Sequence, residues 1–229
     1  MIGGRIFLIS VLGHLLGDFV LQTEKIAEQK SSSKKALLIH GGIITLVQVF
    51  LLSFYGILGI WVGLVSGFLH LGVDLLKTYI SKGKLLSEFF LYIIDQFVHL
   101  LILLLVILIF LKNKDPWFLD IGYVKIIIGI ILLTFVSTVT IKILIRDVQP
   151  KLKEAKLFYN YERLIDGGFS LILCGLIFLP IYYSIALSIF SFYFYQRIQK
   201  LYAYSIAIIT LKYFCFLLIS FIVNFYLMR

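Results

Sequence analysis

Apolar segments, most of them long enough to cross a lipid bilayer, follow one another along this chain of 229 residues. A membrane-spanning helix needs about 20 mainly apolar residues. Only 14% of the residues are charged, whereas a soluble domain has about 25%. The sequence therefore predicts an all-α polytopic transmembrane bundle of about eight spans, with seven as the alternative. The expected spans are 3–22, 37–55, 57–78, 86–111, 121–145, 164–180, 182–197 and 203–227.

The two halves of the chain differ in their polar residues. Residues 1–112 contain all four histidines, and residues 113–229 contain none and are rich in Phe, Tyr and Ile. We expect the first half to be a four-helix transmembrane region that carries His and Asp at a polar site. We expect the second half to be a supporting transmembrane region.

The formal net charge of +9 is spread over short patches between the apolar segments. Lys and Arg concentrate in alternate connections, at 25–35, 77–84, 142–163 and 197–200. The positive-inside rule puts these connections in the cytoplasm and both termini outside. We therefore expect a multi-pass protein of the cell membrane that contacts anionic lipids, not nucleic acid. Residues Lys30 to Lys35 are expected to form a solvated loop with no catalytic role.

Three pairs of ionisable residues inside the apolar segments share one spacing. They are His14 with Asp18, His70 with Asp74, and Asp95 with His99. Because a helix turns once every ~3.6 residues, the two members of a pair lie on one face about one turn apart. Such groups in a bilayer cost about 3 kcal/mol each unless they meet a partner, water or a metal. We expect the pairs and His40 to line one site in the cytoplasmic half of spans one to four.

Imidazole nitrogen and carboxylate oxygen are ligands that suit zinc, iron and manganese. Zinc is the expected ion, with iron or manganese as alternatives. The expected ligands are His14, His70, His99, Asp18, Asp74 and Asp95. The three aspartates and His40 are the expected catalytic groups. A bound metal makes water nucleophilic, and the leading hypothesis is a metal-dependent hydrolase acting on a lipid or another membrane-resident substrate.

Two other functions use the same residue types. A proton- or divalent-metal-coupled transporter needs a polar route to the outer face, but the outer segments 57–66 and 100–111 contain no ionisable residue. A non-enzymatic membrane scaffold would use the pairs as hydrogen-bond clasps between helices.

Further polar residues are expected to support the site. Gln22 and Gln96 stand beside the paired residues. Glu162 and Arg163 open the sixth span at the same cytoplasmic depth, where Arg163 would bind a carboxylate or another anionic group. Lys212 lies within the last span and is expected to pair with a carboxylate that the sequence does not identify.

The chain resembles a bacterial multi-pass membrane family described only as domain of unknown function 3307. The resemblance covers about residues 10–105 and rests on H-x3-DF-x2-Q, a histidine opening the second span, H-x3-D and D-Q-x2-H. In this chain these residues are His14, Asp18, Phe19, Gln22, His40, His70, Asp74, Asp95, Gln96 and His99. Glu162 and Arg163 would be the family's C-terminal glutamate–arginine step. The family is similar to bacterial proteins described as membrane-bound metal-dependent hydrolases, which implies a metal-dependent reaction at these residues.

Overall fold

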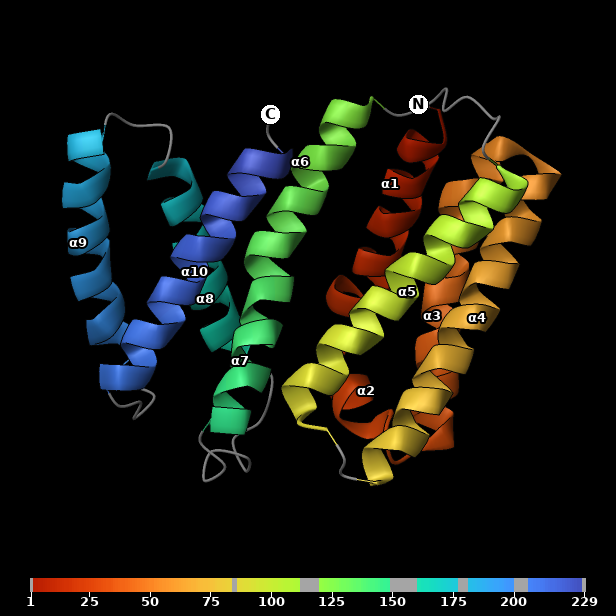
Figure 1. Cartoon of the computed structure of the whole chain (residues 1–229), viewed down its shortest axis with the longest axis horizontal. Coiled ribbons are helices and arrows are strands. Elements are labelled where there is room, and N and C mark those ends of the chain that lie inside the picture. The colour runs from red at the N-terminus through yellow and green to blue at the C-terminus, as the bar shows by residue number, and fades with distance from the viewer. Residues whose placement is uncertain are drawn as a thin grey trace. The chain divides into compact units, whose positions relative to one another are not determined.

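The computed structural model describes residues 2–83, 86–111, 120–148, 160–176, 181–199 and 206–227, and all the secondary structure in them is helical. Figure 1 shows the elements in order along the chain. They are α1 (Ile2–Leu15), the π-helix η1 (Leu16–Val20), α2 (Glu24–Gln29), α3 (Lys34–Leu52), the 3-10 helix η2 (Ser53–Tyr55), α4 (Ile57–Lys82), α5 (Glu88–Phe110), α6 (Ile121–Ile131), the π-helix η3 (Leu132–Val136), α7 (Ser137–Val148), α8 (Asn160–Leu176), α9 (Ile181–Gln199) and α10 (Ile206–Leu227).

Five helical segments among the described residues are long and apolar enough to cross a membrane. They are Lys34–Ser53, Ile57–Lys82, Glu88–Phe110, Ile121–Asp147 and Ile206–Phe225, and the apolar segment Leu164–Leu176 is shorter. The all-α class is thus confirmed for the described residues, and these five helices support a membrane protein. The expected number of seven or eight spans is not confirmed.

Large apolar side chains point outward from these helices. Leu46 of α3 is 71% exposed, Phe68 of α4 is 74% exposed and Phe97 of α5 is 65% exposed. Soluble proteins rarely expose apolar surface in continuous patches of this kind. Such faces suit contact with lipid.

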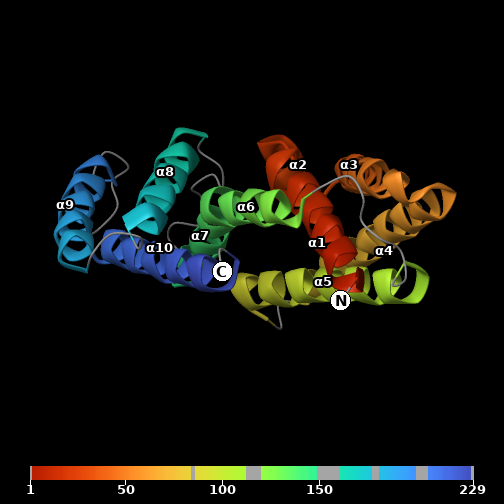
Figure 2. The ribbon, with the colours of Figure 1, turned by 90° about the horizontal axis from the view of Figure 1, so that it is seen from above.

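Contacts within the chain divide it into two compact units, Met1–Ile128 and Gly129–Arg229. In the first unit α1 packs against α3 and α5, and α4 packs against the same two helices, so the four form a closed ring. Figure 2 shows these helices from above. In Figure 1, α2 lies at the end of this unit where α4 ends and α5 begins.

Local sequence signals set the helix boundaries next to the ring. Thr23 caps α2, Ser33 caps α3 and Ser87 caps α5, and each side-chain oxygen accepts a hydrogen bond from the backbone N–H three residues later. Such caps satisfy N–H groups that have no partner within the helix. Gly56 precedes α4 with a φ of 76°, a conformation that favours glycine over other residues.

In the second unit α8 packs against α7, α9, α10 and η3. Aliphatic and aromatic side chains form its core. They are Ile141, Ile145, Phe169, Leu173, Tyr195, Ile208, Ile209, Tyr213 and Phe216.

Candidate metal centre

Seven imidazole and carboxylate side chains meet inside the ring of α1, α3, α4 and α5. This group, called the His/Asp cluster below, consists of His14, Asp18, His40, His70, Asp74, Asp95 and His99. None of the seven side chains is more than 6% exposed. The three pairs and the separate histidine in the sequence therefore lie together in one buried site.

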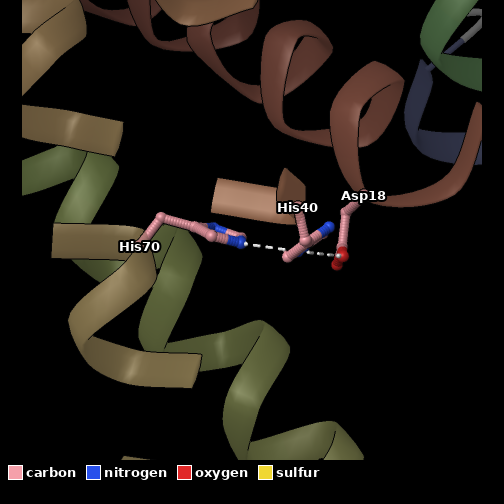
Figure 3. A group of neighbouring side chains, drawn as sticks. All are labelled: Asp18, His40 and His70. Atoms are coloured by element: carbon pink, nitrogen blue, oxygen red, sulfur yellow. Dashed lines mark hydrogen bonds and ion pairs between the residues drawn. The ribbon is translucent and has the colours of Figure 1, made fainter. Parts of the chain in front are cut away.

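His40 of α3 lies at the centre of the first part of the cluster. Its Nε2 atom is 3.3 Å from Oδ1 of Asp18 and 3.2 Å from Oδ2 of Asp74. The same atom is 3.2 Å from Nε2 of His70. Figure 3 shows His40 between Asp18 and His70. Because Asp18 comes from η1 and His70 from α4, three segments of the chain deliver these donors to one point.

Asp74 connects this group to a second one on α4 and α5. Its Oδ2 atom lies 3.6 Å from Nε2 of His70, and its Oδ1 atom lies 3.6 Å from Nε2 of His99. His99 Nε2 is also 3.4 Å from Oδ1 of Asp95. The i, i+4 pairs on α4 and α5 are therefore in direct contact, as expected for regular helices.

The third pair does not have the geometry of a regular α-helix. Helix α1 passes into the π-helical turn η1, which contains Asp18, so Asp18 does not lie directly one α-turn along from His14. Gly17 of the same turn approaches α3 so closely that a Cβ there would lie 2.5 Å from Cδ1 of Ile44. In this turn Asp18 Oδ1 lies 3.3 Å from Nε2 of His40. Turns of this kind are rare and are frequent at functional sites.

Two ammonium groups complete the charge pattern of the cluster. Lys30 Nζ lies 3.4 Å from Oδ1 of Asp18 and 3.4 Å from Nε2 of His40. It is also 3.7 Å from Oδ2 of Asp74. Lys77 Nζ lies 2.8 Å from Oδ2 of Asp95. The expectation of a solvated loop is therefore wrong for Lys30, because α2 packs against α3 and Lys30 directly follows the last residue of α2.

Lys30 keeps its positive charge in this position. Burial lowers the pKa of Lys30, but the carboxylates of Asp18, Asp74 and Asp95 raise it by more, so its pKa lies above the ordinary value. An ammonium group with a raised pKa stays protonated at neutral pH.

The two glutamines expected to support the site both contact the cluster. Gln96 Nε2 donates to Oδ2 of Asp18 at 3.1 Å and to Oδ2 of Asp95 at 3.2 Å, while its Oε1 lies 3.2 Å from Nε2 of His14. Gln22, in the amide orientation that satisfies its hydrogen bonds, donates to Oδ1 of Asp18 at 3.2 Å. These amides fix the orientation of the ionisable groups.

Uncharged polar residues missed by the sequence analysis extend the cluster. Ser10 Oγ donates to Oε1 of Gln48 at 3.0 Å, and Gln48 Nε2 donates to the carbonyl oxygen of Ser10 at 2.8 Å. Ser66 is 1% exposed. Their spacing carried the signal: Ser10 and Ser66 precede His14 and His70 by four residues, one helical turn.

A small cavity lies between this polar layer and the imidazoles. Its volume is about 10 Å³, enough for one water molecule. Its lining consists of His14, Ile44, Gln48, Ser66, His70, His99, Ile102 and Leu103.

Other expected site residues belong to the second unit. The side chains of Glu162 and Arg163 lie outside the described residues, so their role stays a prediction. Lys212 does have a carboxylate partner: its Nζ lies 2.8 Å from Oδ2 of Asp166, and the two side chains are 1% and 0% exposed. Tyr195 Oη and Gln199 Nε2 each donate to Oδ1 of Asp166 at 2.8 Å. All four residues of this network belong to the second unit.

The donor set of the cluster fits a divalent metal ion. Two groups of three residues have ligand atoms within 4.8 Å of one another; these groups are Asp18, His40 and His70, and His70, Asp74 and His99. Ligands bound at about 2.0–2.2 Å to a tetrahedral ion lie about 3.3–3.6 Å apart. In the first group His40 Nε2 lies 3.3 Å from Asp18 Oδ1 and 3.2 Å from His70 Nε2, and in the second group the carboxylate oxygens of Asp74 lie 3.6 Å from the Nε2 atoms of His70 and His99.

Buried atoms without hydrogen bonds point to the same conclusion. Asp74 Oδ2, Asp95 Oδ1 and His99 Nε2 are buried and lie 3.2 to 3.6 Å from imidazole or carboxylate atoms of the cluster, but none of these contacts among the described residues has the geometry of a hydrogen bond. A buried polar atom left in this state costs about 1–3 kcal/mol. A cation coordinated by these atoms would remove that cost.

A family model described as protein of unknown function (DUF3307) matches residues 6–128. The chain belongs to the DUF3307 family. The DUF3307 match covers more than half of the chain and contains every residue of the His/Asp cluster, which confirms the family expected from the sequence motifs. No curated protein and no solved structure matches the chain. Because the description of DUF3307 names no activity, a function has to be inferred from the site itself.

Proposed function

We propose that this chain is a multi-pass protein of a bacterial plasma membrane that binds a divalent metal ion at the His/Asp cluster and hydrolyses a lipid or another membrane-resident substrate. Zinc is the proposed ion, with iron or manganese as alternatives. Lys25 lies in α2, Lys34 and Lys35 begin α3 and Lys82 ends α4, at the end of the unit next to the cluster. By the positive-inside rule, this charge supports a site in the cytoplasmic half of the membrane.

The convergence of imidazole and carboxylate groups from η1, α3, α4 and α5 supports this function most directly. In a structural clasp each imidazole would be paired with one carboxylate. Here the Nε2 atoms of His40 and His70 face each other at 3.2 Å, and Asp74 Oδ2 lies 3.2 to 3.7 Å from three nitrogen atoms, those of His40, His70 and Lys30. Two imidazole nitrogens in this arrangement either share a proton or bind a common ion.

The residues divide into groups that hold the ion and groups that surround it. The proposed ligands are Asp18, His40, His70, Asp74 and His99. When bound, the ion would supply the Lewis acidity that makes a water molecule nucleophilic near neutral pH. Asp95 Oδ1 is the proposed proton acceptor, because it is buried 3.4 Å from His99 Nε2 in a contact that lacks hydrogen-bond geometry. Lys77 holds the other oxygen of Asp95 at 2.8 Å.

His14 has a different environment from the proposed ligands. Its Nε2 atom is engaged by Gln96, while its ring centroid lies 5.3 Å from those of His70 and His99. Its role as a further ligand stays a prediction. The same contacts suit a group that positions the reacting water in the neighbouring cavity.

Metal content tests the proposal directly. The full chain is purified in detergent and its bound metal is measured by mass spectrometry before and after chelation. The wild-type protein is expected to hold zinc, iron or manganese, and His40→Ala is expected to lose it. Metal-loaded protein is then incubated with vesicles of bacterial lipids, whose hydrolysis products are measured. A folded wild-type sample that binds none of the three ions would overturn the proposal.

The polar layer beyond the imidazoles favours a transporter as the second candidate. Ser10 and Gln48 are 0% exposed and Ser66 is 1% exposed, although they lie in apolar helices. A proton- or divalent-metal-coupled transporter needs a polar route from its site to the other face, and this layer would be its first step. Proton or zinc flux in proteoliposomes that is abolished by Gln48→Leu would favour the transporter. Hydrolysis of lipid without flux would favour the enzyme.

A further inference from the structure

The ammonium group of Lys30 lies among the atoms that would bind the metal. The inference drawn from this position rests on the proposed metal site. The ammonium nitrogen is 3.4 Å from Asp18 Oδ1 and 3.4 Å from His40 Nε2. It is 3.7 Å from Asp74 Oδ2, which also faces His40. An ion bound to these donors at about 2.0–2.2 Å would lie within a few ångströms of the ammonium group and would be repelled by it. The two cations therefore compete for one site.

The charge of the cluster depends on whether Lys30 is present. With neutral imidazoles, the three carboxylates and the two lysines leave one net negative charge. Lys77 is bound to Asp95 at 2.8 Å. Withdrawal of Lys30 would leave Asp18 and Asp74 without this ammonium group. Two negative charges match one divalent cation.

Lys30 also belongs to a short segment outside the ring of α1, α3, α4 and α5. It follows α2, a helix of 6 residues, whereas α3, α4 and α5 have 19, 26 and 23 residues. Its side chain is 20% exposed, compared with 6% for Asp18 and 0% for His40. The ammonium group therefore has a path to solvent that the buried donors lack.

We propose that Lys30 is an internal cation that fills the His/Asp cluster until a divalent metal displaces it. The protein then has a closed form with Lys30 in the cluster and a metal-bound form with the α2 connection moved outward. Lys30 thus sets the metal affinity of the site and couples metal binding to the position of α2.

The test measures zinc affinity of the full chain in detergent by competition with a chromophoric chelator. Lys30→Met is expected to bind zinc at least about tenfold more tightly than wild type, because a competing charge is removed. Lys30→Arg keeps the charge and is expected to bind no more tightly than wild type. Lys25→Met is the matched control, since Lys25 is exposed on the same short helix.

A second measurement uses the wild-type chain alone. Amine acylation of Lys30, followed by mass spectrometry, is expected to become faster when zinc is added, while acylation of Lys25 stays constant. Equal affinity of wild type and Lys30→Met, or acylation of Lys30 that zinc does not change, would overturn the displacement of Lys30 and leave the metal site intact. Absence of zinc binding in both proteins would overturn the metal site as well.

Discussion

The imidazole rings of His70 and His99 stack face to face, with their centroids 3.9 Å apart and their planes inclined by 15°. Two positively charged rings at this distance would repel each other, so at least one ring is neutral. Neutral imidazole is also the form that binds metals. The carboxylate of Asp74 lies 3.6 Å from the Nε2 atoms of both rings. Asp74 is therefore the residue that links all the proposed ligands on α3, α4 and α5.

Replacing Asp74 by asparagine should remove most of the metal affinity of the site. The amide has nearly the same shape, but it lacks the negative charge, and its NH2 group cannot act as a ligand. We expect zinc binding to weaken by at least about 100-fold, since loss of a partner next to the ligands alone costs 10–100-fold. The measurement is chelator competition on purified protein. Glu28→Gln, at an exposed position of α2, is the control. An equal zinc affinity of the two variants would show that Asp74 is not a zinc ligand.

The amide of Gln96 should be needed to orient the cluster. It contacts His14, Asp18 and Asp95 at 3.1 to 3.2 Å. Gln96→Met keeps the length of the side chain and removes these contacts. We expect zinc affinity to fall about 10–100-fold while the melting temperature changes little. Gln29→Met makes the same change at an exposed position, and similar results for the two variants would contradict this role.

The part of the site on α4 and α5 could be predicted from spacing alone, because both helices are regular there. A helical period brings His70 to Asp74 and Asp95 to His99, and both pairs are in contact. The same period applied to uncharged residues would have found Ser66, one turn before His70. The all-helical class followed from the long apolar segments for a similar reason, since it depends on local composition.

The remainder of the site depends on contacts that no local pattern encodes. The π-turn that contains Asp18 is associated with the close approach of Gly17 to Ile44 on another helix. The position of Lys30 depends on how α2 packs against α3, whereas its neighbours in sequence, Lys34 and Lys35, are exposed. The basic run therefore looked like a solvated loop, although one of its members, Lys30, contacts the buried cluster.

The buried Lys212 and Asp166 should stabilise the second unit, because the charge of each side chain compensates the opposite charge of the other. Removing one partner leaves an uncompensated charge in an apolar interior, which costs about 3–5 kcal/mol. We expect Lys212→Met and Asp166→Asn each to lower the free energy of unfolding by this amount. The double variant should be more stable than either single variant. Unfolding of the wild type, the two single variants and the double variant in detergent measures the coupling energy between the two residues. A double variant whose loss of unfolding free energy equals the sum of the two single losses would contradict this coupling.

The close approach of α3 and α4 at Gly67 should control the distance between His40 and His70. A Cβ at Gly67 would lie 2.1 Å from Oγ1 of Thr45 and 2.7 Å from its Cα, so the two backbones would have to separate. A Cβ at Gly72 on the same helix would meet no atom within 4 Å.

Gly67→Ala is therefore expected to lower both the melting temperature and the zinc affinity, because it moves apart the two imidazoles whose Nε2 atoms are 3.2 Å apart. Gly72→Ala is the matched control and should leave zinc affinity unchanged, with a gain in stability of about 0.5–1 kcal/mol from the better helix propensity of alanine. Thermal unfolding and chelator competition on both variants separate the two effects. Equal behaviour of the two variants would show that the approach of α3 and α4 at Gly67 does not position the metal ligands.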